Sequence, residues 1–209
     1  MTDAAHTMRT APRRSLTVAL LVAAAFVGTI RGATAESSTI GILITSDRDS
    51  GHFADPKDTK VLLDGAHTFA NGLILGGSFE YRDQAFSQEM TQNLEGTIGY
   101  SVPLAPALSI WGSAGVGERW QENPSTSFPY YVARVGADLD LTQTVTWNVI
   151  TFRYRNSFDP NDNFDTPQLA TGFTYKVDAQ RAITFKVERN RRDGTPSSTG
   201  VSIGFKQGF

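Results

Sequence analysis

Ten segments of the sequence alternate between apolar and polar residues, and this pattern constrains the fold more than any other feature. The segments are 39–46, 60–70, 73–84, 91–102, 107–121, 130–141, 145–157, 168–178, 181–192 and 200–209. A two-residue period puts apolar side chains on one face of a β-strand and polar side chains on the other. No segment after residue 35 shows apolar residues at helical spacing over the length of a helix. The sequence therefore predicts an all-β chain of about ten strands, with eight as the alternative count.

The connections between these predicted strands alternate in length. Those after odd-numbered strands have 13, 6, 8, 10 and 7 residues, whereas those after even-numbered strands have 2, 4, 3 and 2. All eight prolines after residue 35 fall in the connections, as expected for a residue that cannot donate to a sheet. Bacterial outer-membrane barrels have an even number of antiparallel strands, short periplasmic turns and longer external loops. The pattern thus predicts an antiparallel up-and-down transmembrane β-barrel; a soluble up-and-down barrel is the alternative.

The first 35 residues carry the pattern of a secretory signal peptide. Arg9, Arg13 and Arg14 precede a largely apolar run from Leu16 to Ile30, and Ala33-Thr34-Ala35 supplies small residues for cleavage. The apolar run is too short to span a bilayer comfortably, although an uncleaved anchor remains the alternative. We therefore expect a cleaved signal peptide over 1–35 and a barrel domain over 36–209.

Composition excludes several other classes of protein. The sequence has no cysteine, so disulfides, thiolate metal sites and a cysteine nucleophile are excluded. Cleavage after Ala35 would leave 15 basic and 20 acidic residues, a net charge of −5, and no basic stripe that would favour nucleic acid. The mean hydropathy of −0.24 is compatible with a transmembrane barrel, because polar residues facing the lumen dilute the apolar ones facing lipid.

The phase of each strand predicts which residues face the lumen. In 145–157, for example, Ile150 and Phe152 oppose Arg153 and Arg155. The same reasoning places a network of charged residues in the lumen, formed by Glu80, Arg82, Glu95, Arg134, Asp138, Arg153, Arg155, Lys176, Lys186 and Glu188. One strand is out of phase, because Trp147 shares parity with its arginines; either a bulge resets the face or Trp147 plugs the lumen.

These charges favour a filled lumen over a pore. Charges withdrawn from water have to be paired, and a ten-stranded barrel is close to the size whose interior side chains fill. We expect a non-enzymatic protein that serves envelope integrity or surface interaction, with a narrow porin-like channel as the first alternative. An outer-membrane hydrolase is the second alternative, because His52 lies in an acidic loop and His67 in a strand. No cofactor is expected, and the acidic segment 159–165 lacks the glycine and glutamate of a calcium loop.

The last ten residues form an alternating strand that ends on an aromatic residue. One face of this strand holds Val201, Ile203, Phe205, Gln207 and Phe209. It resembles the terminal strand of small bacterial outer-membrane β-barrel proteins, a group that includes porin-like and surface-antigen proteins. The resemblance implies an outer-membrane location, contact with outer-membrane lipid and lipopolysaccharide, and recognition of Phe205 and Phe209 by the barrel-assembly machinery. The sequence leaves the subfamily and the oligomeric state open.

Overall fold

The structure, a computed structural model, describes residues 36–85, 89–122, 125–161 and 164–209. The predicted signal peptide, residues 1–35, lies outside these residues. In the described part of the chain, no helix is long and apolar enough to cross a membrane.

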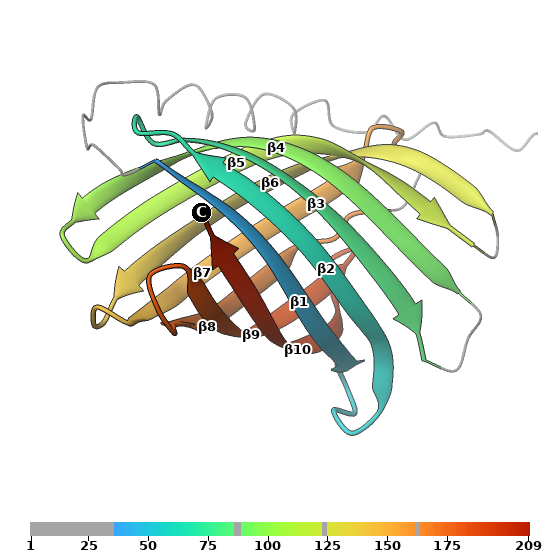
Figure 1. The fold of residues 1–209 in the computed structure, drawn as a ribbon. Coiled ribbons are helices and arrows are strands. Elements are labelled where there is room, and N and C mark those ends of the chain that lie inside the picture. The colour runs from blue at the N-terminus through green and yellow to red at the C-terminus, as the bar shows by residue number, and fades with distance from the viewer. Residues whose placement is uncertain (1–35, 86–88, 123–124, 162–163) are drawn as a thin grey trace, which may run out of the picture.

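In the part of the chain that the structure describes, ten antiparallel strands close into one barrel, as the alternation predicts (Figure 1). The strands are β1 (Ser37–Asp49), β2 (Pro56–Thr68), β3 (Leu73–Gln84), β4 (Met90–Ala105), β5 (Leu108–Gln121), β6 (Thr126–Asp140), β7 (Val145–Ser157), β8 (Gln168–Lys176), β9 (Arg181–Arg192) and β10 (Thr195–Gly208). Each strand pairs with its neighbours in sequence, and β1 pairs with β10. The predicted all-β up-and-down barrel is confirmed, with ten strands rather than eight.

The first and last strands join the barrel into a closed sheet. Ile40 lies opposite Gln207, and Ile44 lies opposite Ile203. The backbone N–H of Phe209 donates to the carbonyl of Ser38 at 2.9 Å, so the pairing continues to the end of the sequence. Closure gives every strand two partners and leaves no open edge, which a sheet within lipid requires.

Five strands, namely β1, β2, β4, β6 and β10, extend further into the connections than the apolar pattern predicts, whereas β2, β6 and β8 end one or two residues earlier than it predicts. Four connections lie at one end of the barrel, together with the start of β1 and the end of β10. We name this end the turn end; its connections are 69–72, 106–107, 141–144 and 177–180. The connections at the opposite end, here named the loop end, are 50–55, 85–89, 122–125, 158–167 and 193–194. The predicted alternation of short and long connections is therefore wrong in detail, because the loop-end connection between β9 and β10 has only two residues.

That connection is a tight hairpin turn. Asp193 and Gly194 both have positive φ, at 50° and 76°, the conformation that two-residue hairpins require. The hairpin lets β10 begin at Thr195 instead of residue 200. Strand extension also brings four prolines predicted to lie in connections to the terminal parts of strands: Pro56, Pro103, Pro129 and Pro196.

An irregularity in β7 explains its change of phase. The pairing of β7 with β8 shifts register between Asn148 and Thr151. On the turn-end side of the shift, Trp147 stacks on Phe173, with ring centroids 6.2 Å apart, and Phe173 faces outward. A bulge thus resets the face, and an inward Trp147 plug is wrong. The inward tryptophan is Trp111, which lies over Gly136; a Cβ at that glycine would be 2.5 Å from the indole.

The barrel has its apolar side chains on the outside. On the outer face of all ten strands, large apolar residues are exposed; examples are Ile40, Ile44, Leu63, Leu75, Leu94, Ile98, Val116, Val135, Phe152, Leu169, Phe173, Phe185, Val201 and Ile203. The buried residues of the interior are mostly polar or charged. This distribution is the reverse of that in a soluble barrel.

Candidate functional site

Lumen-facing residues differ sharply between the two halves of the barrel. Toward the loop end they are buried, as at Asp47, Lys60, Glu80 and Glu188, the last at 2% exposure. Toward the turn end the lumen-facing Asp140, Lys176 and Lys206 are exposed. The side chains of the loop-end half therefore close the lumen, and these buried residues form the candidate site.

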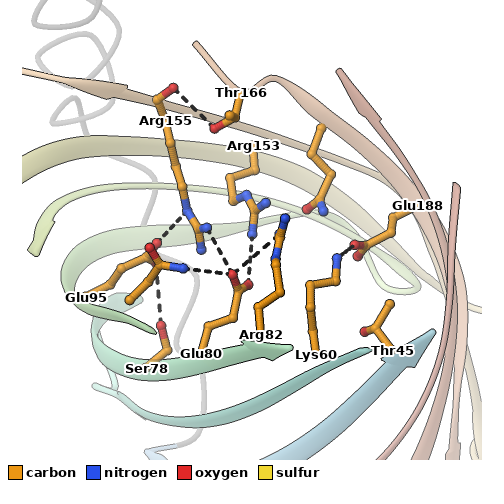
Figure 2. Close-up of polar contacts among 12 residues, drawn as sticks. Thr45, Lys60, Ser78, Glu80, Arg82, Glu95, Arg153, Arg155, Thr166 and Glu188 are labelled. Atoms are coloured by element: carbon orange, nitrogen blue, oxygen red, sulfur yellow. Dashed lines mark hydrogen bonds and ion pairs between the residues drawn. The ribbon is translucent and has the colours of Figure 1, made fainter. Parts of the chain in front are cut away.

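Glu80 of β3 is the centre of an arginine cluster (Figure 2). Its carboxylate lies 3.5 Å from Arg155, 3.7 Å from Arg82 and 3.8 Å from Arg153, and it accepts a hydrogen bond of 2.9 Å from Asn93. The three arginines come from β3 and β7, on opposite sides of the lumen. Glu80 thus connects two distant walls of the barrel.

Glu95 of β4 is the second acceptor for Arg155. The Nε of Arg155 lies 2.6 Å from one carboxylate oxygen, which also accepts a hydrogen bond of 2.9 Å from the Tyr130 hydroxyl. The other oxygen is paired with Arg134 and accepts from Ser78 at 3.5 Å. Figure 2 shows Arg155 reaching down between Glu95 and Glu80. Removal of either glutamate would leave arginine charge buried without compensation.

A second group of charges crosses the seam between the first and last strands. Lys60 of β2 lies 2.8 Å from Asp47 and pairs with Glu188 of β9, which also binds Lys186 at 2.8 Å. Asp58 lies directly opposite Asp47 and 3.6 Å from Arg82. Because Arg82 also contacts Glu80, the two groups form one network across the lumen. We name this set the lumen plug: Asp47, Asp58, Lys60, Glu80, Arg82, Glu95, Arg134, Arg153, Arg155, Lys186 and Glu188.

An aromatic cluster covers the lumen plug on its loop-end side. Phe164, in the connection 158–167, is buried and packs against Phe128 at 5.2 Å and Tyr130 at 5.1 Å. The Arg119 guanidinium lies 5.0 Å from the centre of the Phe164 ring. A side chain from the longest loop-end connection therefore adds an apolar layer above the ionic one.

Eight of the ten predicted network residues belong to the lumen plug, and two do not. Asp138 instead accepts hydrogen bonds from the Trp111 indole at 3.0 Å and from Asn148 at 2.8 Å. Lys176 is exposed at the turn end of β8. Both residues face the lumen as their phase predicts, but they lie too far toward the turn end to reach the plug.

Sequence reasoning missed four residues of this region. The alternation places Asp47 and Asp58 in the connection 47–59, and the predicted network omits Lys60. Tyr130 is fully buried and faces inward, although it lies next to the outward Tyr131. The available signal was phase: Thr45 and Asp47 continue the lumen-facing parity of Gly41 beyond the apolar part of the strand.

The turn-end half of the lumen holds a cavity of about 380 Å³. Its wall is mostly small or polar, for example Gly76, Ser113 and Thr184, with Leu43 and Leu62 adding an apolar patch. Arg134 and Lys186 border both the cavity and the lumen plug. The lumen is thus partly open at the turn end and filled at the loop end.

The two histidines among the described residues, His52 and His67, lie apart from this site. His52 is exposed in the connection 50–55. The Nδ1 of His67 lies 2.8 Å from the Ser38 hydroxyl and its Nε2 lies 3.2 Å from Glu36. This Ser–His–Glu arrangement resembles a hydrolytic triad in composition, but it lies on the outer face, and none of the three lines the lumen cavity. The described residues contain no group of three or more His, Cys, Asp or Glu that could hold a metal. Part of the acidic segment 159–165 lies outside them.

Two carboxylates in the connections have shifted pKa values. In the turn 177–180, the pKa of Asp178 is lowered by hydrogen bonds from the Arg181 side chain and from the Gln180 backbone N–H. In the connection 158–167, burial and the nearby charge of Asp193 raise the pKa of Asp165. The loop-end connections 158–167 and 193–194 meet where the Asp193 backbone N–H donates to the Asp165 carbonyl at 3.1 Å. Because the ionised Asp165 faces the charge of Asp193, this contact is strongest at acidic pH and weakens as the pH rises through the raised pKa of Asp165.

Comparison with known proteins gives similarity in fold at low sequence identity. No protein-family model and no curated protein sequence matches the chain. Among solved structures, an outer-membrane channel from Pseudomonas putida F1 has 8% identity and a TM-score of 0.49, covering 87% of this chain and 98% of that one. The NanC porin has 9% identity and a TM-score of 0.47, with coverage of 80% and 98%. The KdgM porin has 15% identity and a TM-score of 0.44, with coverage of 82% and 99%.

The class of protein follows from the barrel itself. Its strands close without an edge, its exterior is apolar and its interior carries paired charges. Lipid accepts an apolar exterior, and a membrane-spanning sheet must satisfy all its backbone hydrogen bonds internally. This chain is a small transmembrane β-barrel of the bacterial outer-membrane type.

Proposed function

We propose that this protein is a closed outer-membrane barrel without catalytic activity, which serves envelope integrity or surface interaction through its loop end. The lumen plug is the observation that supports this function, because its charges are buried, paired across the lumen and covered by Phe164. A conducting path would need these contacts to separate. The Ser38–His67–Glu36 arrangement gives no support to a hydrolase, because the three residues lie on the outer face and none of them lines either cavity.

We further propose an orientation with the turn end in the periplasm and the loop end outside the cell. The start of β1, the end of β10 and four connections of two to four residues lie at the turn end. Outer-membrane barrels usually have their short turns on the periplasmic side. Phe205 lies on the outer face of β10 and Phe209 directly follows that strand, and the barrel-assembly machinery could bind both, because they are 42% and 75% exposed.

A planar-bilayer recording tests the closed-lumen proposal. Purified protein inserted in the bilayer is expected to give no conductance steps in concentrated potassium chloride, because no continuous water path crosses the plug. A porin reconstituted in parallel shows that insertion and recording work. Reproducible steps from correctly folded protein would contradict the proposal.

A narrow channel is the second candidate function, and the cavity of about 380 Å³ favours it. The turn-end part of the lumen already holds this cavity, so only the lumen plug and the Phe164 layer above it would have to rearrange. In that case the same recording would show steps that change in size when Glu80 or Arg153 is neutralised, because both lie at the blocked level.

A further inference from the structure

Four neighbouring strands change from apolar to polar on their outer face at the same level. The four are β9, β10, β1 and β2, which are adjacent in the barrel. Toward the loop end, their outward residues read Ile183, Phe185, Val187, Arg189 on β9; Phe205, Ile203, Val201, Thr199 on β10; Ile40, Ile42, Ile44, Ser46, Arg48 on β1; and Leu63, Val61, Thr59, Lys57 on β2. The change marks the edge of the apolar surface on this side of the barrel.

Three basic residues lie at that edge, on β9, β1 and β2. Arg189 lies opposite Thr199, and Thr199 lies opposite Arg48. Lys57 reaches over β1 from β2, and its ammonium donates to the Ser197 carbonyl at 2.7 Å. Neighbouring strands are about 4.8 Å apart, so the backbones of Arg189 and Arg48, two strands apart, are separated by about 10 Å. We name Lys57, Arg48 and Arg189 the cationic row.

Two acidic residues border the cationic row; Asp49 attracts Lys57, but neither carboxylate forms an ion pair with Arg48 or Arg189. The Asp49 carboxylate accepts hydrogen bonds from the backbone N–H groups of Gly51 and His52, at 2.7 and 3.2 Å. Asp83 lies opposite Thr59, at the far side of β2. Arg189 itself donates to the Thr199 hydroxyl, an uncharged partner.

An apolar groove begins at the end of the cationic row. A cavity of about 280 Å³ lies on the outside of the barrel, lined by Val149, Ile150, Leu169 and Val187, with Arg189 and Thr199 at one end. It forms where β7 shifts register against β8, because Val149 and Ile150 lie within that irregularity. We name this cavity the outer groove. Its lining places aliphatic side chains and a guanidinium in one continuous surface.

We propose that the cationic row and the outer groove together bind a phosphate-bearing glycolipid of the outer leaflet, with its phosphate on Arg48 and Arg189 and an acyl chain in the groove. Charge complementarity supports the phosphate, because arginine pairs bidentately with phosphate oxygens. The aliphatic lining beside it supports the chain. The inference rests on the proposed orientation, which puts the loop end in the outer leaflet.

Lipid binding by purified protein tests this site. Native mass spectrometry of the full barrel with diphosphorylated lipid A is expected to give at least tenfold tighter binding than with dephosphorylated lipid A. The double variant Arg48→Gln/Arg189→Gln should lose this preference. Arg181→Gln is the matched control, because Arg181 lies on the same strand and outer face as Arg189 but at the turn end. Equal binding by the wild type and the double variant would overturn the proposal.

A second variant separates a lipid site from a simple anion site. Val187→Trp places bulk in the outer groove without changing charge, so it should weaken lipid A binding severalfold. Inorganic phosphate at millimolar concentration should not displace the lipid. Full displacement by phosphate, together with no effect of Val187→Trp, would show an anion site only and overturn the lipid assignment.

These outcomes are independent of the proposed function. If the wild-type barrel shows no preference for diphosphorylated lipid A, but stays membrane-bound and gives no conductance steps, only the lipid site is contradicted. Recovery of the barrel as a soluble protein would contradict both.

Discussion

Glu95→Ala will lower the free energy of unfolding by about 3–5 kcal/mol, the cost of breaking a buried ion pair by removing one partner. Glu95 is 3% exposed and holds Arg134 and Arg155 together with the Tyr130 hydroxyl. Alanine removes the acceptor and leaves two guanidinium groups facing each other. Glu80 remains 3.5 Å from Arg155, but it already compensates Arg82 and Arg153.

Urea-induced unfolding in lipid vesicles measures this effect. Glu95→Gln should fall between wild type and Glu95→Ala, because the amide can still accept hydrogen bonds but carries no charge. Glu122→Ala, at an exposed glutamate beyond β5, is the control and should change stability by less than about 0.5 kcal/mol. A loss below about 1 kcal/mol for Glu95→Ala would show that the network contributes little to folding.

Ile203→Arg will destabilise the protein by about 2–4 kcal/mol, the cost of a basic residue on the lipid face near the bilayer midplane. Ile203 points outward from the middle of β10, between Val201 and Phe205, and is 53% exposed. In water such a substitution would be nearly free, because the arginine would be solvated. In a membrane the guanidinium is forced into hydrocarbon.

A second outward position supplies the depth control. Gln92 lies near the loop end of β4, opposite Trp120, where we expect the membrane interface. Gln92→Arg should cost only about 0–1 kcal/mol. Unfolding in vesicles measures both changes in the free energy of unfolding. If both substitutions change it equally and negligibly, the barrel is not embedded in lipid.

The fold was largely predictable because the decisive signal is local. Each strand has its own two-residue period, and the pairing of β10 with β1 follows because a barrel must close. Strand ends were less predictable, because the strands continue to pair by backbone hydrogen bonds beyond the last outward apolar residue, where the sequence alternation ends. Asp47 of β1 and Asp58 of β2 lie opposite each other in the sheet, in a stretch where the sequence has no apolar alternation.

The sequence predicts most of the charged residues of the candidate site, but it does not predict which of them form ion pairs. Phase identified the inward charges, yet partners depend on the stagger of strands around the barrel, which brings Glu80 within reach of Arg155 across 75 positions of sequence. Depth along the lumen separates Lys176 and Asp138 from the plug, and phase carries no information on depth. The bulge that turns Trp147 outward is likewise a property of pairing with β8.

Membrane fractionation with heat-modifiable gel migration tests the central claim most directly, namely that this chain is a closed transmembrane barrel with a charged interior. The account predicts that the protein remains in the outer-membrane fraction after washing with alkaline carbonate. It also predicts that unheated and boiled samples migrate at different positions, because the closed barrel resists detergent until heated. Recovery of the folded protein in the soluble periplasmic fraction would contradict the account.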